Sequence, residues 1–264
     1  MRTRDIPTTF GVGLVTGFVA GLVGLGGAEL RIPFILYLFG IQIRQMIPLN
    51  LLISLITSGS SFLVRWQSGL LPLSSIPLSA SMIIGSIGGG FLGSKISNKV
   101  SVRKLEAFLA LILSIVIIRL LVELFVEGEP TRVFPEYLEL PFAAVFGLGI
   151  GVIAGSVGVA GGEYRIPALM FLFGSPIKIA GTISQLVSIP TVVISILKHN
   201  QHQIMDRRLL WVGATMGVGS LVGVLLSGLV ILDIPDALLN SVFILILTYT
   251  VVKLVQDLFK VRRS

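Results

Sequence analysis

Long apolar segments alternate with short polar segments along the whole chain. Eight of them have close to the ~20 residues that a helix needs to cross ~30 Å of hydrocarbon. They lie at 8–24, 48–66, 72–96, 102–126, 138–158, 177–197, 207–231 and 236–259. The pattern therefore predicts an all-α polytopic membrane protein.

One apolar segment occurs twice. Residues 21–40 read GLVGLGGAELRIPFILYLFG, and residues 155–174, which lie 134 positions later, read GSVGVAGGEYRIPALMFLFG. Eleven of the twenty positions are identical, and the same offset relates Gly13 to Gly147. Internal repeats of this kind are the building plan of many secondary transporters. We therefore expect two repeats of about 134 residues each.

Each repeat is predicted to begin with a broken, re-entrant helical hairpin and to continue with three transmembrane helices. The N-terminal repeat covers 1–126, with its hairpin at 8–44 and its spans at 48–66, 72–96 and 102–126. The C-terminal repeat covers 138–264, with its hairpin at 138–175 and its spans at 177–197, 207–231 and 236–259. Residues 127–137 form the linker.

The charges between the spans predict that the two repeats are inverted. The basic segments are both termini, 95–104 and 198–208, whereas 65–71 carries only Arg65, 233–236 is acidic and the linker is rich in Glu. Basic loops are retained in the cytoplasm. Both termini are therefore predicted to be cytoplasmic and the linker extracytoplasmic. This arrangement fits a multi-pass protein of the inner (plasma) membrane.

The hairpins are predicted from prolines and glycines. Segment 33–41 covers only about half of the membrane as a helix. Pro33 suits a helix start and disfavours helix in the residue before it, while three preceding glycines loosen the chain. We therefore expect residues 24–32 to be unwound before a helix that begins at Pro33. Residues 158–166 and Pro167 repeat the pattern.

A helix N-terminus inside the membrane attracts anions. Arg31 and Arg165 could add forked donors for an oxyanion. Glu29 and Glu163 could neutralise the empty site and carry protons. The predicted substrate site comprises Gly24, Gly26, Gly27, Glu29, Arg31, Asn50 and Ser54 with Gly158, Gly161, Gly162, Glu163, Arg165, Ser184, Gln185 and Ser188.

Structural roles are the alternatives for these residues. The two Glu/Arg pairs could be salt bridges that fix the hairpin tips, and Asn50 and Gln185 could hydrogen-bond between helices. The Gly-x-x-x-Gly rows could serve packing within the chain or a homodimer.

Composition excludes several other classes. The chain is 54% hydrophobic and 12% charged, with a mean hydropathy of +0.97. It has no cysteine, which removes disulfides and thiolate chemistry. The pI is about 10.1, but the basic residues lie in loops and termini, so we expect no nucleic-acid partner. We also expect no metal and no cofactor, and the partners are a small anion and the lipid bilayer.

With these motifs, the chain resembles the sulfite exporter TauE/SafE family, also called the toluene-sulfonate uptake permease family. The resemblance rests on Gly24-Leu25-Gly26-Gly27 before Pro33 and on Gly158-Val159-Ala160-Gly161-Gly162 before Pro167. It implies transport of small sulfur-containing anions, such as sulfite, sulfoacetate and organosulfonates, across the inner membrane. Ala28 and Ala160 each depart from the usual glycine run.

The leading hypothesis is a secondary transporter that moves a small anion by alternating access, with its site between two opposed broken-helix tips. The substrate would be a sulfur oxyanion or organosulfonate. An anion channel and a small-carboxylate transporter are the alternatives. An intramembrane enzyme is disfavoured, because its chemistry would have to come from Glu and Arg alone.

Overall fold

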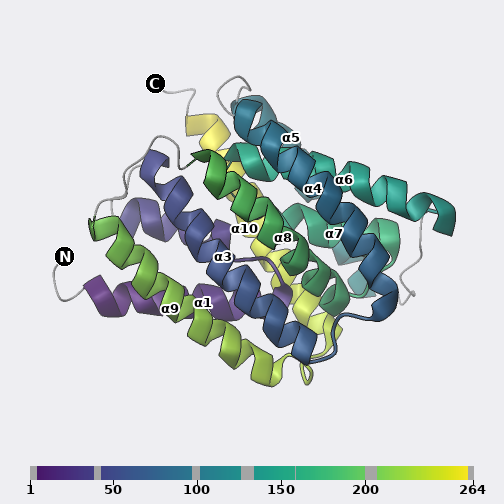
Figure 1. The fold of residues 1–264 in the computed structure, drawn as a ribbon, viewed down its shortest axis with the longest axis horizontal. Coiled ribbons are helices and arrows are strands. Elements are labelled where there is room, and N and C mark those ends of the chain that lie inside the picture. The colour runs from purple at the N-terminus through teal and green to yellow at the C-terminus, as the bar shows by residue number, and fades with distance from the viewer. Residues whose placement is uncertain are drawn as a thin grey trace.

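The chain is helical almost throughout the part that the computed structural model describes, which is residues 5–38, 43–96, 102–125, 134–157, 159–199 and 207–260 (Figure 1). The first half contains α1 (Asp5–Val23), α2 (Ala28–Pro33), the π-helical turn η1 (Phe34–Leu38), α3 (Ile43–Gln67), the 3-10 turn η2 (Leu73–Ser75), α4 (Ile76–Ile96) and α5 (Val102–Phe125). The second half contains α6 (Glu136–Val157), α7 (Gly162–Phe173), α8 (Ile177–His199), α9 (Arg207–Val230) and α10 (Asp236–Lys260).

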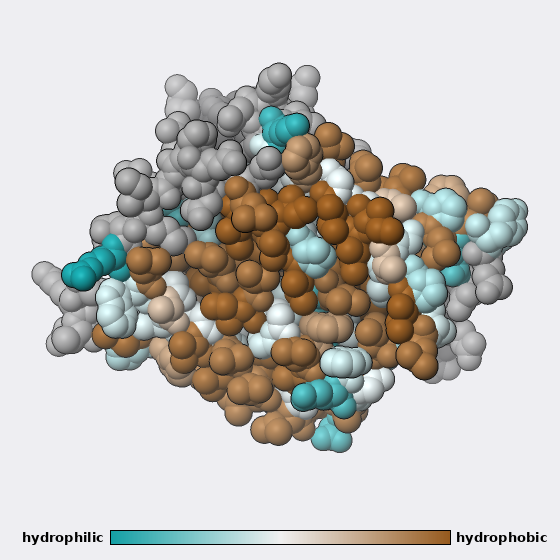
Figure 2. Space-filling model, in the orientation of Figure 1, coloured by the Kyte–Doolittle hydropathy of each residue, from teal (hydrophilic) through white to brown (hydrophobic). Residues whose placement is uncertain are grey.

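Within the described residues, seven helices are long and apolar enough to cross a membrane. These are α1, α3, α4, α6, α8, α9 and α10. The predicted span 102–126 corresponds to α5, whose described apolar part is Leu113–Val122. Apolar side chains cover much of the face in Figure 2, as expected of a surface that meets lipid. The prediction of an all-α polytopic membrane protein is confirmed.

The re-entrant helices begin earlier than predicted. α2 starts at Ala28 and α7 at Gly162, so Pro33 and Pro167 lie inside the helical segments rather than at their first positions. The N-caps Gly27 and Gly161 have φ of 69° and 76°, a left-handed conformation that favours glycine. The expected unwinding is therefore found at 24–27 and 159–161, but it was wrong for 28–32 and 162–166, because the helices begin five residues before each proline.

Glycine rows bring backbones from the two halves into contact. In α1, Gly13, Gly17 and Gly21 lie against Met216, Ser220 and Val224 of α9. In α6, Gly147, Gly151 and Gly155 lie against Met82, Ser86 and Gly90 of α4. The two sets of pairs are related by the repeat offset. Adding 134 to each α1 residue gives the α6 residue, and subtracting 134 from each α9 residue gives the α4 residue that this α6 residue contacts. The α1–α9 contact is therefore equivalent to the α6–α4 contact, with the two halves of the chain interchanged. We call this the internal two-fold relation. Small residues are the usual means of such close packing in membranes.

The same contacts fix helix directions. Residue numbers rise together along α1 and α9 and along α4 and α6, so the helices of each pair run parallel. α3 also runs parallel to α9, because its residues Leu49, Ile56 and Val64 lie in order against α9 glycines at 213, 217 and 228.

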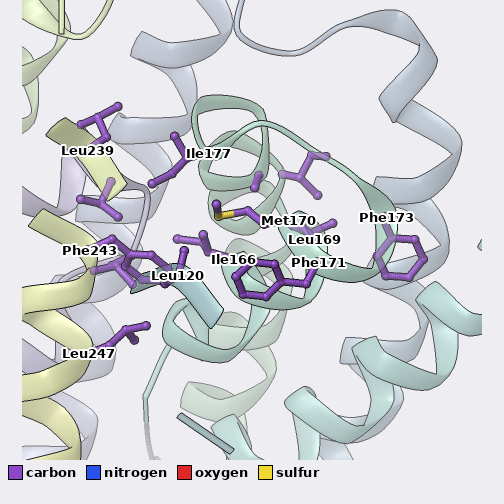
Figure 3. Packing of buried hydrophobic residues seen from close by; sticks show 14 of the residues in the cluster. Leu120, Ile166, Leu169, Met170, Phe171, Phe173, Ile177, Leu239, Phe243 and Leu247 are labelled. Atoms are coloured by element: carbon purple, nitrogen blue, oxygen red, sulfur yellow. The ribbon is translucent and has the colours of Figure 1, made fainter. Parts of the chain in front are cut away.

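Apolar packing holds the second re-entrant helix. Nine of its residues are buried, among them Ile166, Leu169 and Phe173. Figure 3 shows these side chains in one cluster with Leu120 of α5 and Phe243 of α10. A short helix in this position is thus enclosed by protein, which is the condition for broken helices at membrane depth.

Replacing Gly89 by Ala should lower the free energy of unfolding by about 1–3 kcal/mol, the usual cost of overpacking. Its Cβ would meet the Leu148 carbonyl oxygen of α6 closer than Cβ contacts normally allow. Gly88→Ala is the matched control in the same helix, since a Cβ there meets nothing within 4 Å. SDS-induced unfolding in mixed micelles would measure both. Equal stability of the two variants would contradict the tight α4–α6 contact.

Candidate functional site

The tips of the two re-entrant hairpins meet in the protein interior. A methyl group at Gly26 would lie 3.1 Å from the Cβ of Ala160. These two residues are equivalent under the 134-residue offset, so the contact lies at the centre of the internal two-fold relation. Gly26 has φ of 82°, which a residue with a side chain rarely adopts.

Arg31 lies in the first turns of α2 and is fully buried. Its guanidinium donates to Gly26 O at 3.0 Å, Ser54 Oγ at 2.8 Å, Asn50 Oδ1 at 3.3 Å and Thr57 Oγ1 at 3.2 Å. Three of these acceptors belong to α3, so the side chain fastens the first tip to that helix. A buried charge is tolerated only with such partners.

Arg165 makes the corresponding contacts from α7 and is also fully buried. Its Nη1 donates to Ser188 Oγ at 2.8 Å and to Ser184 O at 2.9 Å, and its Nη2 donates to Ala160 O at 3.4 Å. Both guanidiniums thus bond the carbonyl at the centre of their own tip. Direct contact with an anion would require some of these bonds to be exchanged.

The remaining predicted residues of the first repeat also lie at its tip. Asn50 Nδ2 donates to the carbonyl of Ala28 at 3.2 Å. Gly24 has φ of 93° and its backbone lies against that of Gly181 in α8. Gly27 caps α2. Glu29 belongs to α2, but its side chain lies outside the described residues.

In the second repeat, Glu163 is 3% exposed in the first turn of α7. Gly162 packs against the backbone of Leu25. Ser184, Gln185 and Ser188 are fully buried in α8. Gln185 Nε2 donates to the carbonyl of Ala20 in the other repeat at 3.4 Å. Gly158 lies outside the described residues. The structure therefore brings the described predicted residues together around one pair of tips.

Sequence reasoning missed Thr57 and Ser58, which face the first tip. The repeat offset could have found Thr57, because Thr191 occupies the equivalent position and is also buried.

Arg65 was expected in a loop, and this was wrong. It lies at the end of α3 and is 1% exposed. It donates to Gly21 O and Leu22 O at 2.6 and 3.0 Å, to Lys178 O at 2.6 Å and to Thr182 Oγ1 at 3.0 Å. The C-terminal carbonyls of a helix lack intrahelical donors, and a cation is favourable there. Arg65 thus supplies donors where α1 breaks and ties that point to α8.

The comparisons with known proteins identify a family. The family model described as "Sulfite exporter TauE/SafE" matches residues 2–120 and 143–263, one segment in each half. The chain belongs to the TauE/SafE family. The resemblance seen in the sequence is thereby confirmed, and the protein is a multi-pass membrane transporter of that family.

Curated relatives carry the same general description. A probable membrane transporter protein of Xylella fastidiosa (strain Temecula1) is 26% identical over 263 residues, which is 93% of each chain. The probable membrane transporter protein YdhB of Bacillus subtilis is 26% identical over 180 residues, covering 67% of this chain and 71% of the relative. No solved structure matches the chain. These names describe transport rather than catalysis.

Replacing Arg65 by Met should lower the free energy of unfolding by at least about 2 kcal/mol, because each buried acceptor left without a donor costs about 1–3 kcal/mol. Lys178→Ala is the control: it keeps the backbone carbonyl that Arg65 binds. It removes a partly exposed ion pair with Asp236 at 3.4 Å and an exposed hydrogen bond to the Leu232 carbonyl at 3.4 Å. Such pairs contribute about 0–1 kcal/mol. SDS titration would compare them, and a smaller loss for Arg65→Met than for Lys178→Ala would contradict this role.

Proposed function

We propose that this TauE/SafE protein is a secondary transporter of a small anion, a sulfur oxyanion or organosulfonate, and works by alternating access. The contact between two tips that each carry a buried arginine is the observation that supports this most strongly. Broken helices with termini near the membrane centre form the substrate sites of many transporters. The buried guanidiniums would give this region a positive potential, which attracts an anion.

Alternating access is supported by the helix directions. α3 and α4 are consecutive spans joined by a short connection, so they cross the membrane in opposite senses. Because α1 runs with α9 and α3, while α6 runs with α4, equivalent helices α1 and α6 cross in opposite senses. We infer inverted repeats from this pattern. Rocking of one repeat against the other would then open the tips to each side in turn.

Loop charges support cytoplasmic termini in the inner (plasma) membrane. With Arg65 inside α3, the connection from Ser68 to Ser75 has no charged residue. The equivalent residues 202–209 carry Asp206 together with Arg207 and Arg208, which begin α9. Under the positive-inside rule, this contrast favours an outside position for the first connection and an inside position for the second. A homodimer could use glycines that leave open space, such as Gly11 and Gly149.

Purified protein in liposomes should take up labelled sulfite or ethanesulfonate with saturation when a membrane potential is imposed, at about 2.3 kcal/mol per 100 mV for a monoanion. In the double variant Arg31→Ala/Arg165→Ala, anion flux should fall at least about tenfold. Both tips lose their positive charge and the hydrogen bonds of the guanidinium to the next helix. Lys178→Ala should retain flux. Undiminished flux in the double variant would refute the site, and unitary currents without saturation would indicate a channel.

Glu163→Gln should abolish acceleration of anion uptake by an inward proton gradient while leaving potential-driven flux within about threefold. The reason is that Glu163 is a buried carboxyl beside the second tip and the amide cannot carry a proton. The same result is expected for Glu29→Gln. Parallel measurements with a pH gradient and with a potassium-diffusion potential would separate the two driving forces. A full response of both variants to pH would exclude these residues as coupling groups.

A further inference from the structure

Two unpaired polar groups face the first tip. A methyl group at Gly26 would lie 3.0 Å from Ser58 Oγ and 3.9 Å from Gln185 Oε1. Both side chains are fully buried, and neither atom has a hydrogen-bond partner among the described residues. Because buried polar atoms are nearly always paired, such a pair points to a ligand.

The equivalent groups at the second tip are apolar. The offset of 134 relates Ser58 to Val192 and Gln185 to Leu51. Leu51 and Val192 are fully buried and form one apolar cluster with Ala160. At these two positions, the side of the contact that faces Gly26 is therefore polar, and the side that faces Ala160 is apolar. The second tip does hold one buried hydroxyl without a partner among the described residues, that of Ser184, which lies beside Arg165.

This difference stands out because several neighbouring positions are kept in both repeats. Each tip has an arginine, and the serines that receive their bonds, Ser54 and Ser188, are equivalent. Thr57 and Thr191 are equivalent as well. The two-fold relation therefore holds at these positions. It is broken where Asn50 is equivalent to Ser184, and again at the side chains that face the point of contact.

We propose that the substrate is an organic anion that binds between the tips in one orientation. Its oxyanion head, a sulfonate or carboxylate, lies beside Ser58 and Gln185, and a short alkyl group lies beside Leu51 and Val192. The inference rests on the proposed function and narrows its substrate class. An inorganic oxyanion, which is polar on all sides, would face the leucine and valine without partners for its oxygens.

The chemistry of each side fits this orientation. The Ser58 hydroxyl can donate to an oxyanion, and rotation of the Gln185 amide would exchange one long bond to Ala20 O for a donor to the head. The Arg31 guanidinium is bonded to the carbonyl of Gly26, so its charge lies close to the head. On the other side, each methylene in an apolar pocket contributes about 10- to 200-fold in discrimination.

The test compares labelled ethanesulfonate with labelled sulfite in proteoliposomes under a fixed potential. The native protein should show at least about a tenfold lower KM for ethanesulfonate. Leu51→Gln/Val192→Ser copies the polar side onto the apolar side and should reduce that preference by at least tenfold. The converse swap, Ser58→Val/Gln185→Leu, should raise the KM for both anions by at least tenfold.

A milder substitution tests the same orientation if the double variants fail to fold. Val192→Thr nearly conserves the side-chain shape, and its hydroxyl can bond its own helix backbone, so it should fold and reduce the preference in the same direction. Flux of both anions with an unchanged KM ratio in the native protein and in all swaps would overturn the orientation and leave anion transport standing. No flux of either anion, or of propionate, would overturn both.

Discussion

A helix that breaks inside a membrane leaves backbone groups that water cannot reach, and each must find a partner within the protein. In this chain, side chains from α3 and α8 supply several of those partners. Arg65 binds the carbonyls of Gly21 and Leu22, and Gln185 binds that of Ala20. Asn50 binds the carbonyl of Ala28. The placement of these buried polar side chains follows from the break.

The two tip arginines serve the same requirement from within their own hairpins. Each reaches back five residues to a carbonyl of the irregular chain, Gly26 or Ala160, and extends to the serine on the next helix. The charges that suggest anion binding are therefore also the groups that hold the tips in shape. A single set of bonds links the stability of the hairpins to the potential at their centre.

Much of the fold could be predicted from sequence. Span length and hydropathy gave the helices, and the duplicated motif gave the position of both tips. The helix starts were wrong because glycine and proline made competing predictions. Pro33 is a good first helical residue, but Gly27 adopts a left-handed conformation that ends the irregular chain earlier. Which of the two prevails depends on what the tip packs against, and the local sequence does not contain that information.

Sequence by itself determined the apolar segments, their order, the repeat and the two arginines of the tips, because these are local properties or follow from one offset. Only the tertiary structure decided which atoms those charges bind. Arg65 looked like a loop residue, yet it bonds Thr182, 117 positions away. Likewise, Ser58 and Gln185 become neighbours only because α3 and α8 enclose Gly26. Contacts between distant segments depend on how the helices pack, and hydropathy along the chain does not encode that.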